Sequence, residues 1–203
     1  METPGKTVII RETMPEDDIS SNLQHAIRGK WAKFCPRCGH RLEERFLDGE
    51  QKPQKVCGNC GFIYYLNPKV AAGAIPSQDG KIWLIRRNIE PSSGSWTYPG
   101  GYVDLGECVP DAAVREAYEE TMLRVRLDRL LNVYSYGESG IVMIAYCATV
   151  ISGTPAITPE SREIRSFGLD EIPWDDLAFP STREALAEYV KLQQKENESP
   201  RGF

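Results

Sequence analysis

Long apolar segments are the first feature that this chain lacks. The longest largely apolar run extends only from Ile141 to Ile151, whereas a helix that crosses a bilayer needs about 20 such residues. The first thirty residues contain no apolar stretch of the kind a secretory signal needs, and they carry acidic side chains that transit peptides usually lack. We therefore expect no membrane span and a cytoplasmic protein, with an organelle as the alternative.

An excess of positive charge is also missing. The 203 residues include 24 basic and 29 acidic side chains, and the resulting net charge of -5 disfavours general binding of nucleic acid. Hydrophobic residues make up 41% of the chain and charged residues 26%, which fits a folded globular protein and excludes a collagen-like or wholly disordered one. The length suits one ordinary domain plus a small module.

Cysteines are few, but four of the six are patterned. They form two Cys-x-x-Cys pairs separated by eighteen residues: Cys35, Cys38, Cys57 and Cys60. This spacing is typical of a zinc site rather than of a secreted disulfide scaffold. Because four thiolates leave no open position on a tetrahedral Zn²⁺, we predict a structural role. We interpret Cys108 and Cys147 as small buried residues.

The pattern of apolar residues and turn signals divides the chain into four parts. We expect a disordered or loosely docked tail over 1–30, a small β zinc ribbon over 31–66, an α/β domain over 67–192 and a second tail over 193–203. The domain is predicted to contain a strand pair around a turn at 77–80, a loop over 89–107 and a helix over 109–122. Further strands are expected over 130–136, 141–150 and 164–169, and a last helix over 182–193.

The segment 28–60 is locally basic. Eight basic and four acidic residues give it a charge of about +4, which leaves about -9 on the rest of the chain. A solvated basic face is our first interpretation, and contact with nucleic acid is the less favoured alternative.

Three glutamates share one face of the predicted helix 109–122. Glu116, Glu119 and Glu120 are spaced i, i+3 and i+4, within an arc of about 100°. Such carboxylates repel one another on a bare helix, and a divalent cation reverses that repulsion. Oxygen-only ligands suit Mg²⁺ or Mn²⁺. The opposite face, expected to meet the core, carries Val114, Ala117, Tyr118 and Thr121.

Residues before the helix support a metal or phosphate site over a merely solvated acidic surface. Gly101, Glu107 and Arg115 stand at defined offsets from the three glutamates, and the chain enters the helix through the glycine-rich loop 99–101. Glycines let the backbone approach a metal or a phosphate closely.

The stretch from Gly101 to Leu123 resembles the Nudix box, Gly-x5-Glu-x7-Arg-Glu-U-x-Glu-Glu-x-Gly-U, in which U is apolar. One fixed position departs: the last glycine of the family's pattern is Met122 here. A side chain in a left-handed helix cap costs on the order of 1 kcal/mol. This departure puts the local geometry in question but removes no metal ligand.

A second resemblance covers residues from about 34 to 189. A zinc ribbon directly before a Nudix domain is similar to the plant-type FAD and ADP-ribose pyrophosphatases and, more distantly, to the NADH pyrophosphatases. The matching pieces include Tyr65-x-Asn-Pro-Lys69, Arg87-Asn-Ile-x-Pro-Ser92 and Pro159-Glu-Ser161. The tract that NADH pyrophosphatases carry after the box is missing, and so is the proline that many ADP-ribose pyrophosphatases place there.

The resemblance implies an α/β/α sandwich with a mixed sheet and hydrolysis of a nucleoside diphosphate linked to a second moiety, FAD or ADP-ribose first. It implies that Glu116, Glu119 and Glu120 hold Mg²⁺ or Mn²⁺ with the carbonyl of Gly101, and that Arg115 pairs with Glu107. In several relatives a later glutamate activates the water. Of Glu160 and Glu163, which both precede the strand 164–169, we choose Glu163, with Glu116 as the rival.

Substrate contacts are weakly encoded. Arg87 could meet phosphates, and an adenine or flavin ring needs an aromatic surface, for which Tyr65, Trp96 and Tyr102 are candidates. A homodimer is implied by resemblance alone. Two alternatives remain: hydrolysis of capped RNA or nucleotide sugars, and a non-catalytic Nudix ligand sensor, which the intact glutamate set disfavours.

Overall fold

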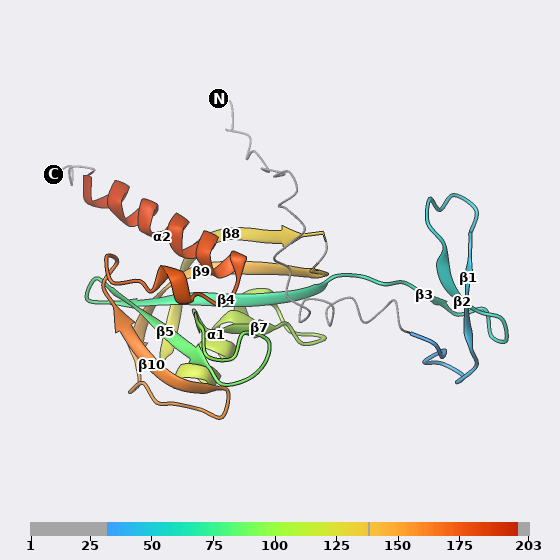
Figure 1. The fold of residues 1–203 in the computed structure, drawn as a ribbon, viewed down its shortest axis with the longest axis horizontal. Helices are drawn as coiled ribbons and strands as arrows, with labels where there is room; N and C mark the ends of the chain where they lie inside the picture. The colour runs from blue at the N-terminus through green and yellow to red at the C-terminus, as the bar shows by residue number, and fades with distance from the viewer. Residues whose placement is uncertain (1–31, 138, 199–203) are drawn as a thin grey trace.

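The computed structural model describes residues 32–137 and 139–198. The expected tail over 1–30 therefore lies outside the described residues, as do 199–203. Figure 1 shows two parts, a small three-stranded ribbon and a larger α/β sandwich, connected by the segment between β3 and β4. Within the described residues, no helix is both long and apolar enough to cross a membrane.

The ribbon is an antiparallel sheet of three short strands in sequence order. They are β1 (Leu42–Arg45), β2 (Gln54–Cys57) and β3 (Ile63–Tyr64). Its buried core consists of Cys35, Leu42 and Cys57, with partly buried neighbours around them. A core of this size is too small to fold without a metal or a disulfide.

The larger part is built on a mixed seven-stranded sheet whose main order is β10-β5-β4-β9-β8, with β6 beside β5 and β7 beside β4. Only β4 and β9 pair in parallel; the other pairs among the described residues are antiparallel. The strands are β4 (Lys69–Gln78), β5 (Lys81–Arg87), β6 (Trp96–Thr97), β7 (Gly100–Tyr102), β8 (Arg124–Tyr136), β9 (Ile141–Ser152) and β10 (Ser161–Phe167). The predicted α/β sandwich with a mixed sheet is confirmed.

One helix covers each face of this sheet (Figure 1). Along β4 the side chains alternate, so Ala72 and Ala74 pack against alanines of α1 (Val109–Thr121). Ile75 faces the other way and packs in the main core with residues of α2 (Pro180–Glu198). Small residues on the α1 side bring that helix close to the sheet, which places its glutamates beside β7.

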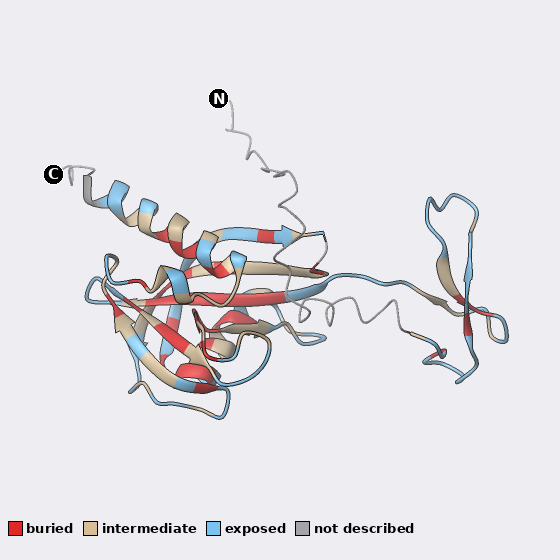
Figure 2. Ribbon diagram, viewed as in Figure 1, coloured by how far each residue is buried: buried red, intermediate tan, exposed pale blue. Residues whose placement is uncertain are grey.

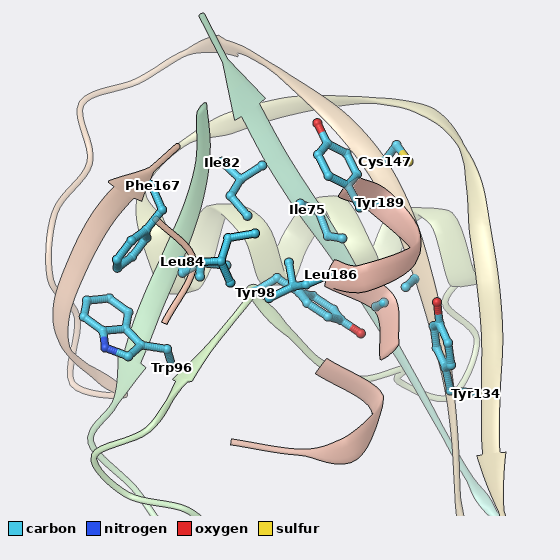
Figure 3. Packing of buried hydrophobic residues seen from close by; sticks show 13 residues of the cluster. Ile75, Ile82, Leu84, Trp96, Tyr98, Tyr134, Cys147, Phe167, Leu186 and Tyr189 are labelled. Atoms are coloured by element: carbon cyan, nitrogen blue, oxygen red, sulfur yellow. The ribbon is translucent and has the colours of Figure 1, made fainter. Parts of the chain in front are cut away.

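The main core fills the space between the sheet and α2 (Figures 2 and 3). Ile75, Ile82 and Leu84 from β4 and β5 are fully buried, and Leu186 of α2 packs on them. Trp96 is also in this core, with its ring edge-on to Phe167 at a centroid distance of 4.9 Å. The short helix η4 (Trp174–Asp176) closes the same side.

Several predicted boundaries were wrong. The hairpin turn is Asp79-Gly80 alone, both with positive φ, while Ser77 and Gln78 continue β4. The predicted loop 89–107 contains β6 and β7. These short strands form because β6 pairs with β5 and β7 pairs with β4, and both partner strands lie outside that loop. β8 begins six residues before the predicted start at 130, and α2 extends to 198 through the predicted tail.

Two burial predictions were wrong as well. Cys108 is exposed at the N-cap of α1, whereas Cys147 is buried as predicted. Tyr118 is 37% exposed, and the guanidinium of Arg124 lies over its ring at 4.9 Å. Ala117 and Thr121 are buried as predicted.

Candidate functional site

The four patterned cysteines meet at one end of the ribbon. Their sulfur atoms all lie within 4.8 Å of one another. Three of the Sγ···Sγ distances are 3.7 Å (Cys35–Cys60), 3.5 Å (Cys38–Cys57) and 3.4 Å (Cys38–Cys60). A tetrahedral ion with Zn–S bonds of about 2.3 Å requires sulfur separations of about 3.8 Å. The donor set and its spacing therefore fit zinc.

The two knuckles of this site have the same geometry. The N–H of Gly39 donates to the carbonyl of Cys35 at 2.9 Å, and the N–H of Gly61 donates to the carbonyl of Cys57 at 3.0 Å. Both glycines have a φ near +70°, at 75° and 70°. That left-handed conformation favours glycine and turns each chain tightly enough for two thiolates to face one ion.

Glu120 is the most buried carboxylate of the helix, with 5% of the residue exposed. Its Oε2 accepts a 2.8 Å hydrogen bond from the backbone N–H of Gly100. Burial raises the pKa of Glu120 to about 8, and the negative charges of Glu116 and Glu160 act in the same direction. A buried carboxylate with like charges around it is stabilised by a nearby cation.

Glu116 lies directly against the glycine loop. A Cβ on Gly101 would sit 2.5 Å from Glu116 Oε1, so a side chain there would displace the carboxylate of Glu116. Burial is the main cause that raises the pKa of Glu116, and the negative charges of Glu119 and Glu160 add to it. The sequence-predicted ligand positions Gly101, Glu116 and Glu120 are thus brought together.

Arg115 holds the loop and the acidic face in place. Its Nε and Nη2 donate to the two carboxylate oxygens of Glu107 at 2.8 and 2.9 Å, which lowers the pKa of Glu107 to about 2. The same guanidinium donates to Glu116 at 2.8 Å, to Glu119 at 2.9 Å and to the carbonyl of Tyr102 at 3.0 Å. The bidentate pair fixes the loop before α1 to the helix.

The acidic face fits a divalent cation in chemistry, although Arg115 engages two of its members here. Glu116, Glu119 and Glu120 offer hard oxygen donors; Glu120 is buried, whereas Glu116 and Glu119 pair with Arg115. Mg²⁺ and Mn²⁺ prefer this donor type. Glu116 and Glu119 each accept from Arg115 through one carboxylate oxygen, which leaves the other oxygen for an ion.

The two candidate bases near the start of β10 differ in their surroundings. Glu163 pairs with Arg86 at 3.6 Å on the α2 side, where Arg86 also meets Asp176. The negative charge of Glu160 adds to the causes that raise the pKa of both Glu116 and Glu120. Our first choice, Glu163, thus faces α2 rather than α1.

A β-bulge in β10 explains why Glu163, the base chosen from the sequence, faces away from α1. Ser161 pairs with Arg87 and Glu163 with Arg86, so two steps along β10 correspond to one step along β5. In a regular strand Ser161 and Glu163 would face the same side. The extra residue rotates Glu163 away from α1 and leaves Ser161 on the α1 side, where its Oγ lies 3.4 Å from the carbonyl oxygen of Glu120.

The candidate substrate contacts divide into three kinds. Arg87 is half-buried; its Nε donates to the carbonyl of Pro91 at 2.8 Å, its guanidinium lies 5.1 Å from the ring centroid of Phe179, and the charge of Glu120 acts on its pKa. Tyr102 is 47% exposed beside Gly101, with Lys69 Nζ 4.5 Å from its ring centroid, a contact that the sequence did not reveal. Trp96 lies in the core, which corrects its assignment as a stacking surface. Tyr65 is exposed in the segment that links the ribbon to β4.

Comparisons with known proteins agree with this geometry. The sequence profile of the NUDIX domain matches residues 67–189, and the profile described as Nudix N-terminal, a zinc ribbon, matches residues 33–66. An ADP-ribose pyrophosphatase from Methanocaldococcus jannaschii is 38% identical over 119 residues, which cover 57% of this chain and 69% of that protein.

An NAD-capped RNA hydrolase NudC from Edwardsiella ictaluri is 30% identical over 144 residues, or 70% of this chain. The chain spans about half of that relative, 53% of its length. Among solved structures, a NUDIX hydrolase from Nitrosomonas europaea has a TM-score of 0.77 and 35% identity, with 83% of this chain and 94% of that chain covered. An ADP-ribose pyrophosphatase from Streptococcus suis has a TM-score of 0.54 and 25% identity, with 68% and 97% covered.

Proposed function

Since the chain belongs to the Nudix hydrolase family and carries an N-terminal zinc ribbon, we propose that it hydrolyses the diphosphate of a nucleoside diphosphate linked to a second moiety, with ADP-ribose as the first substrate to test. The observation that carries the proposal is the packing of Glu116 and Glu120 against Gly100 and Gly101. Buried acids beside a glycine loop form a cation-dependent phosphate site.

A divalent cation, Mg²⁺ before Mn²⁺, is the proposed cofactor of this site. Glu116, Glu119, Glu120 and the carbonyl of Gly101 would hold it. When bound, such an ion neutralises phosphate oxygens and acidifies a coordinated water. Arg115 and Glu107 act as positioning residues, because their bidentate pair joins the loop to the helix that carries the glutamates.

Glu160 is the proposed general base, in place of Glu163. Its charge already acts on Glu116 and Glu120, whereas Glu163 is engaged by Arg86 on the other face. A carboxylate in this place can take the proton from the attacking water while the leaving phosphate departs as an anion. Glu116 is a weaker candidate for this role because Arg115 and the proposed metal both engage it.

Arg87 and Tyr102 are the proposed substrate contacts. The guanidinium of Arg87 would meet a phosphate, and the exposed ring of Tyr102 would offer a stacking surface for a base. ADP-ribose precedes FAD in this proposal because two of the similar proteins are described as ADP-ribose pyrophosphatases.

NAD-capped RNA is the second candidate substrate. The match to the NudC proteins covers up to 76% of this chain, more than the NUDIX domain alone. Within the ribbon, however, Arg45 pairs with Glu43 and Lys55 with Glu44, which reduces the positive charge available to RNA. We also propose a homodimer and a cytoplasmic location, which light scattering and cell fractionation would test.

A turnover screen tests the proposed function. The wild type and Glu120→Gln are incubated with Mg²⁺ and ADP-ribose, FAD, NADH, diadenosine polyphosphates or NAD-capped RNA, and the products are identified by mass. We expect AMP plus ribose 5-phosphate from ADP-ribose, lost in the variant. No turnover of any compound by a zinc-loaded, folded protein would favour a ligand sensor instead.

A further inference from the structure

Two sequence segments that the proposed chemistry does not use meet at Glu160. One is Asn88, which directly follows β5 and Arg87. The other is the start of β10, where Ser161 follows Glu160 directly. Both belong to motifs that stood out in the sequence, Arg87-Asn-Ile and Pro159-Glu-Ser161. Their contacts show how the backbone of Glu160 is fixed from two sides.

Asn88 fixes the backbone from the β5 side. Its backbone N–H donates to the carbonyl of Glu160 at 2.8 Å. Its side-chain Nδ2 donates to the carbonyl of Pro159 at 3.0 Å. Two adjacent carbonyls of the β9–β10 connection are thus held by one residue. Since Asn88 is exposed, its side chain does not contribute to core packing, and the bond to Pro159 is its structural contact.

Ser161 fixes the backbone from the α1 side. Only 1% of the residue is exposed, and its Oγ accepts a hydrogen bond from the N–H of Thr158 at 3.1 Å. The same Oγ lies 3.4 Å from the carbonyl oxygen of Glu120, toward which its hydroxyl points as donor.

Nearby, the N–H of Ala156 donates to the carbonyl of Thr121 at 3.2 Å. The connection that carries Glu160 is therefore bonded to the C-terminal turn of α1, the turn that carries Glu120.

We propose that Asn88 and Ser161 are positioning residues that hold Glu160 at a fixed distance from the acidic face of α1. Catalysis by a carboxylate depends steeply on its placement, and a shift of ~1 Å can cost up to about 10²-fold in rate. The side chain of Glu160 is exposed, so its own packing does not fix it. The inference rests on the proposed hydrolase function, because it assigns these two residues to the base of that reaction.

Activity measurements with matched controls test the inference. Asn88→Ala and Ser161→Ala are compared with two controls, Asn132→Ala and Ser77→Ala. Each control also removes a side-chain hydrogen bond, with a length of 2.8 or 3.0 Å, but at a position remote from the site. We expect kcat with ADP-ribose to fall on the order of 10-fold in the first two variants, with little change in KM and none in the controls.

A double-mutant cycle separates positioning from general destabilisation. In the Glu160→Gln background, neither Asn88→Ala nor Ser161→Ala should reduce kcat further, because the group that they position has lost its function. A full additional loss in that background would overturn the inference, since the two residues would then act through something other than Glu160.

Hydrogen–deuterium exchange supplies a readout that does not depend on turnover. We expect both variants to accelerate exchange in 154–161 while the rest of the domain keeps wild-type protection. If the wild type hydrolyses none of the substrates, the proposed function fails, and exchange alone still decides whether the segment is held. Unchanged exchange together with unchanged kcat would overturn the inference.

Discussion

At the scale of single residues, burial sets the properties of the site. Glu120 is nearly inaccessible, and its carboxylate accepts a hydrogen bond from the N–H of Gly100. Removal of a carboxylate from water favours its neutral form, which explains why the pKa of Glu120 rises to about 8. The glutamate that suits a cation best therefore lowers the stability of the metal-free protein when it is ionised.

Glu120→Gln should make the metal-free protein less sensitive to pH. With a pKa raised from 4.5 to about 8, the folded wild type retains a proton that the unfolded chain releases. The stability that Glu120 contributes is therefore greatest below pH 4.5 and is lost as the pH rises toward 8, whereas glutamine does not titrate. Urea midpoints of both proteins, in zinc-replete buffer without Mg²⁺, should diverge in favour of the variant as the pH increases.

The converse effect of the metal completes this test. Mg²⁺ should raise the urea midpoint of the wild type at pH 8 and leave that of Glu120→Gln nearly unchanged, because a ligand stabilises only the state that binds it. Parallel pH profiles for the two proteins would mean that Glu120 is ionised in the fold without a cation.

Glu160→Gln should reduce kcat by about 10²-fold or more if Glu160 is the general base. Glu163→Gln is the matched control, because it removes the same charge three residues away and breaks only the exposed pair with Arg86. Steady-state kinetics with ADP-ribose would check this. A large loss in Glu163→Gln with an active Glu160→Gln would restore the sequence-based assignment.

At the scale of elements, the end of α1 and the start of β10 decide the local geometry. Met122 caps α1 with a φ of 61°, and its N–H donates to the carbonyl of Tyr118 at 2.7 Å. The left-handed cap of the family's glycine is therefore kept with a residue that is strained there. The bulge in β10, by contrast, does change the local geometry, because it alters which side chains face α1.

Met122→Gly should stabilise the protein by about 1 kcal/mol, because glycine adopts a φ of 61° without a steric penalty. The side chain is 38% exposed, so little packing is lost. Urea unfolding at equilibrium would measure the difference, with Met122→Ala as a control that keeps the strain and gains nothing. A lower midpoint for the glycine variant would show that the Met122 side chain contributes more than its strain costs.

At the scale of the whole molecule, the two parts have unequal cores. The sandwich has a main cluster of thirteen buried residues between the sheet and α2 and smaller clusters under α1. The buried cluster of the ribbon has three residues, of which two are cysteines of the metal site. We infer that the sandwich supplies its own stability and that the ribbon depends on zinc.

Removal of zinc should therefore unfold the ribbon and spare the sandwich. In Cys35→Ser/Cys38→Ser, limited proteolysis should cut within 32–66 while a fragment from about 69 onward survives. Turnover of ADP-ribose should persist, since the acidic site lies entirely in the sandwich. Mass analysis of the fragments and a zinc assay would check this; loss of the whole domain would show that the ribbon stabilises it.

Patterns that are local in sequence were enough to predict much of this protein. The spacing of Cys35, Cys38, Cys57 and Cys60 predicts one metal site, because two short turns can bring four thiols together wherever the rest of the chain lies. Helical periodicity predicted α1 nearly to the residue and placed its glutamates on one face. The resemblance to the Nudix box predicted the pair of Glu107 and Arg115 that joins loop and helix.

The tertiary structure alone decided features that depend on distant partners. Trp96 is in the core because β6 is bound by β5 and faces Phe167 of β10, which lies 71 residues later. Glu163 faces away from α1 because the register of β10 against β5 shifts by one residue between Ser161 and Glu163, and a shift of one residue reverses the face of every side chain beyond it. No local periodicity encodes that register. The sequence by itself thus determined the candidate metal ligands, and the packing of the sheet determined which side of it Glu163 faces.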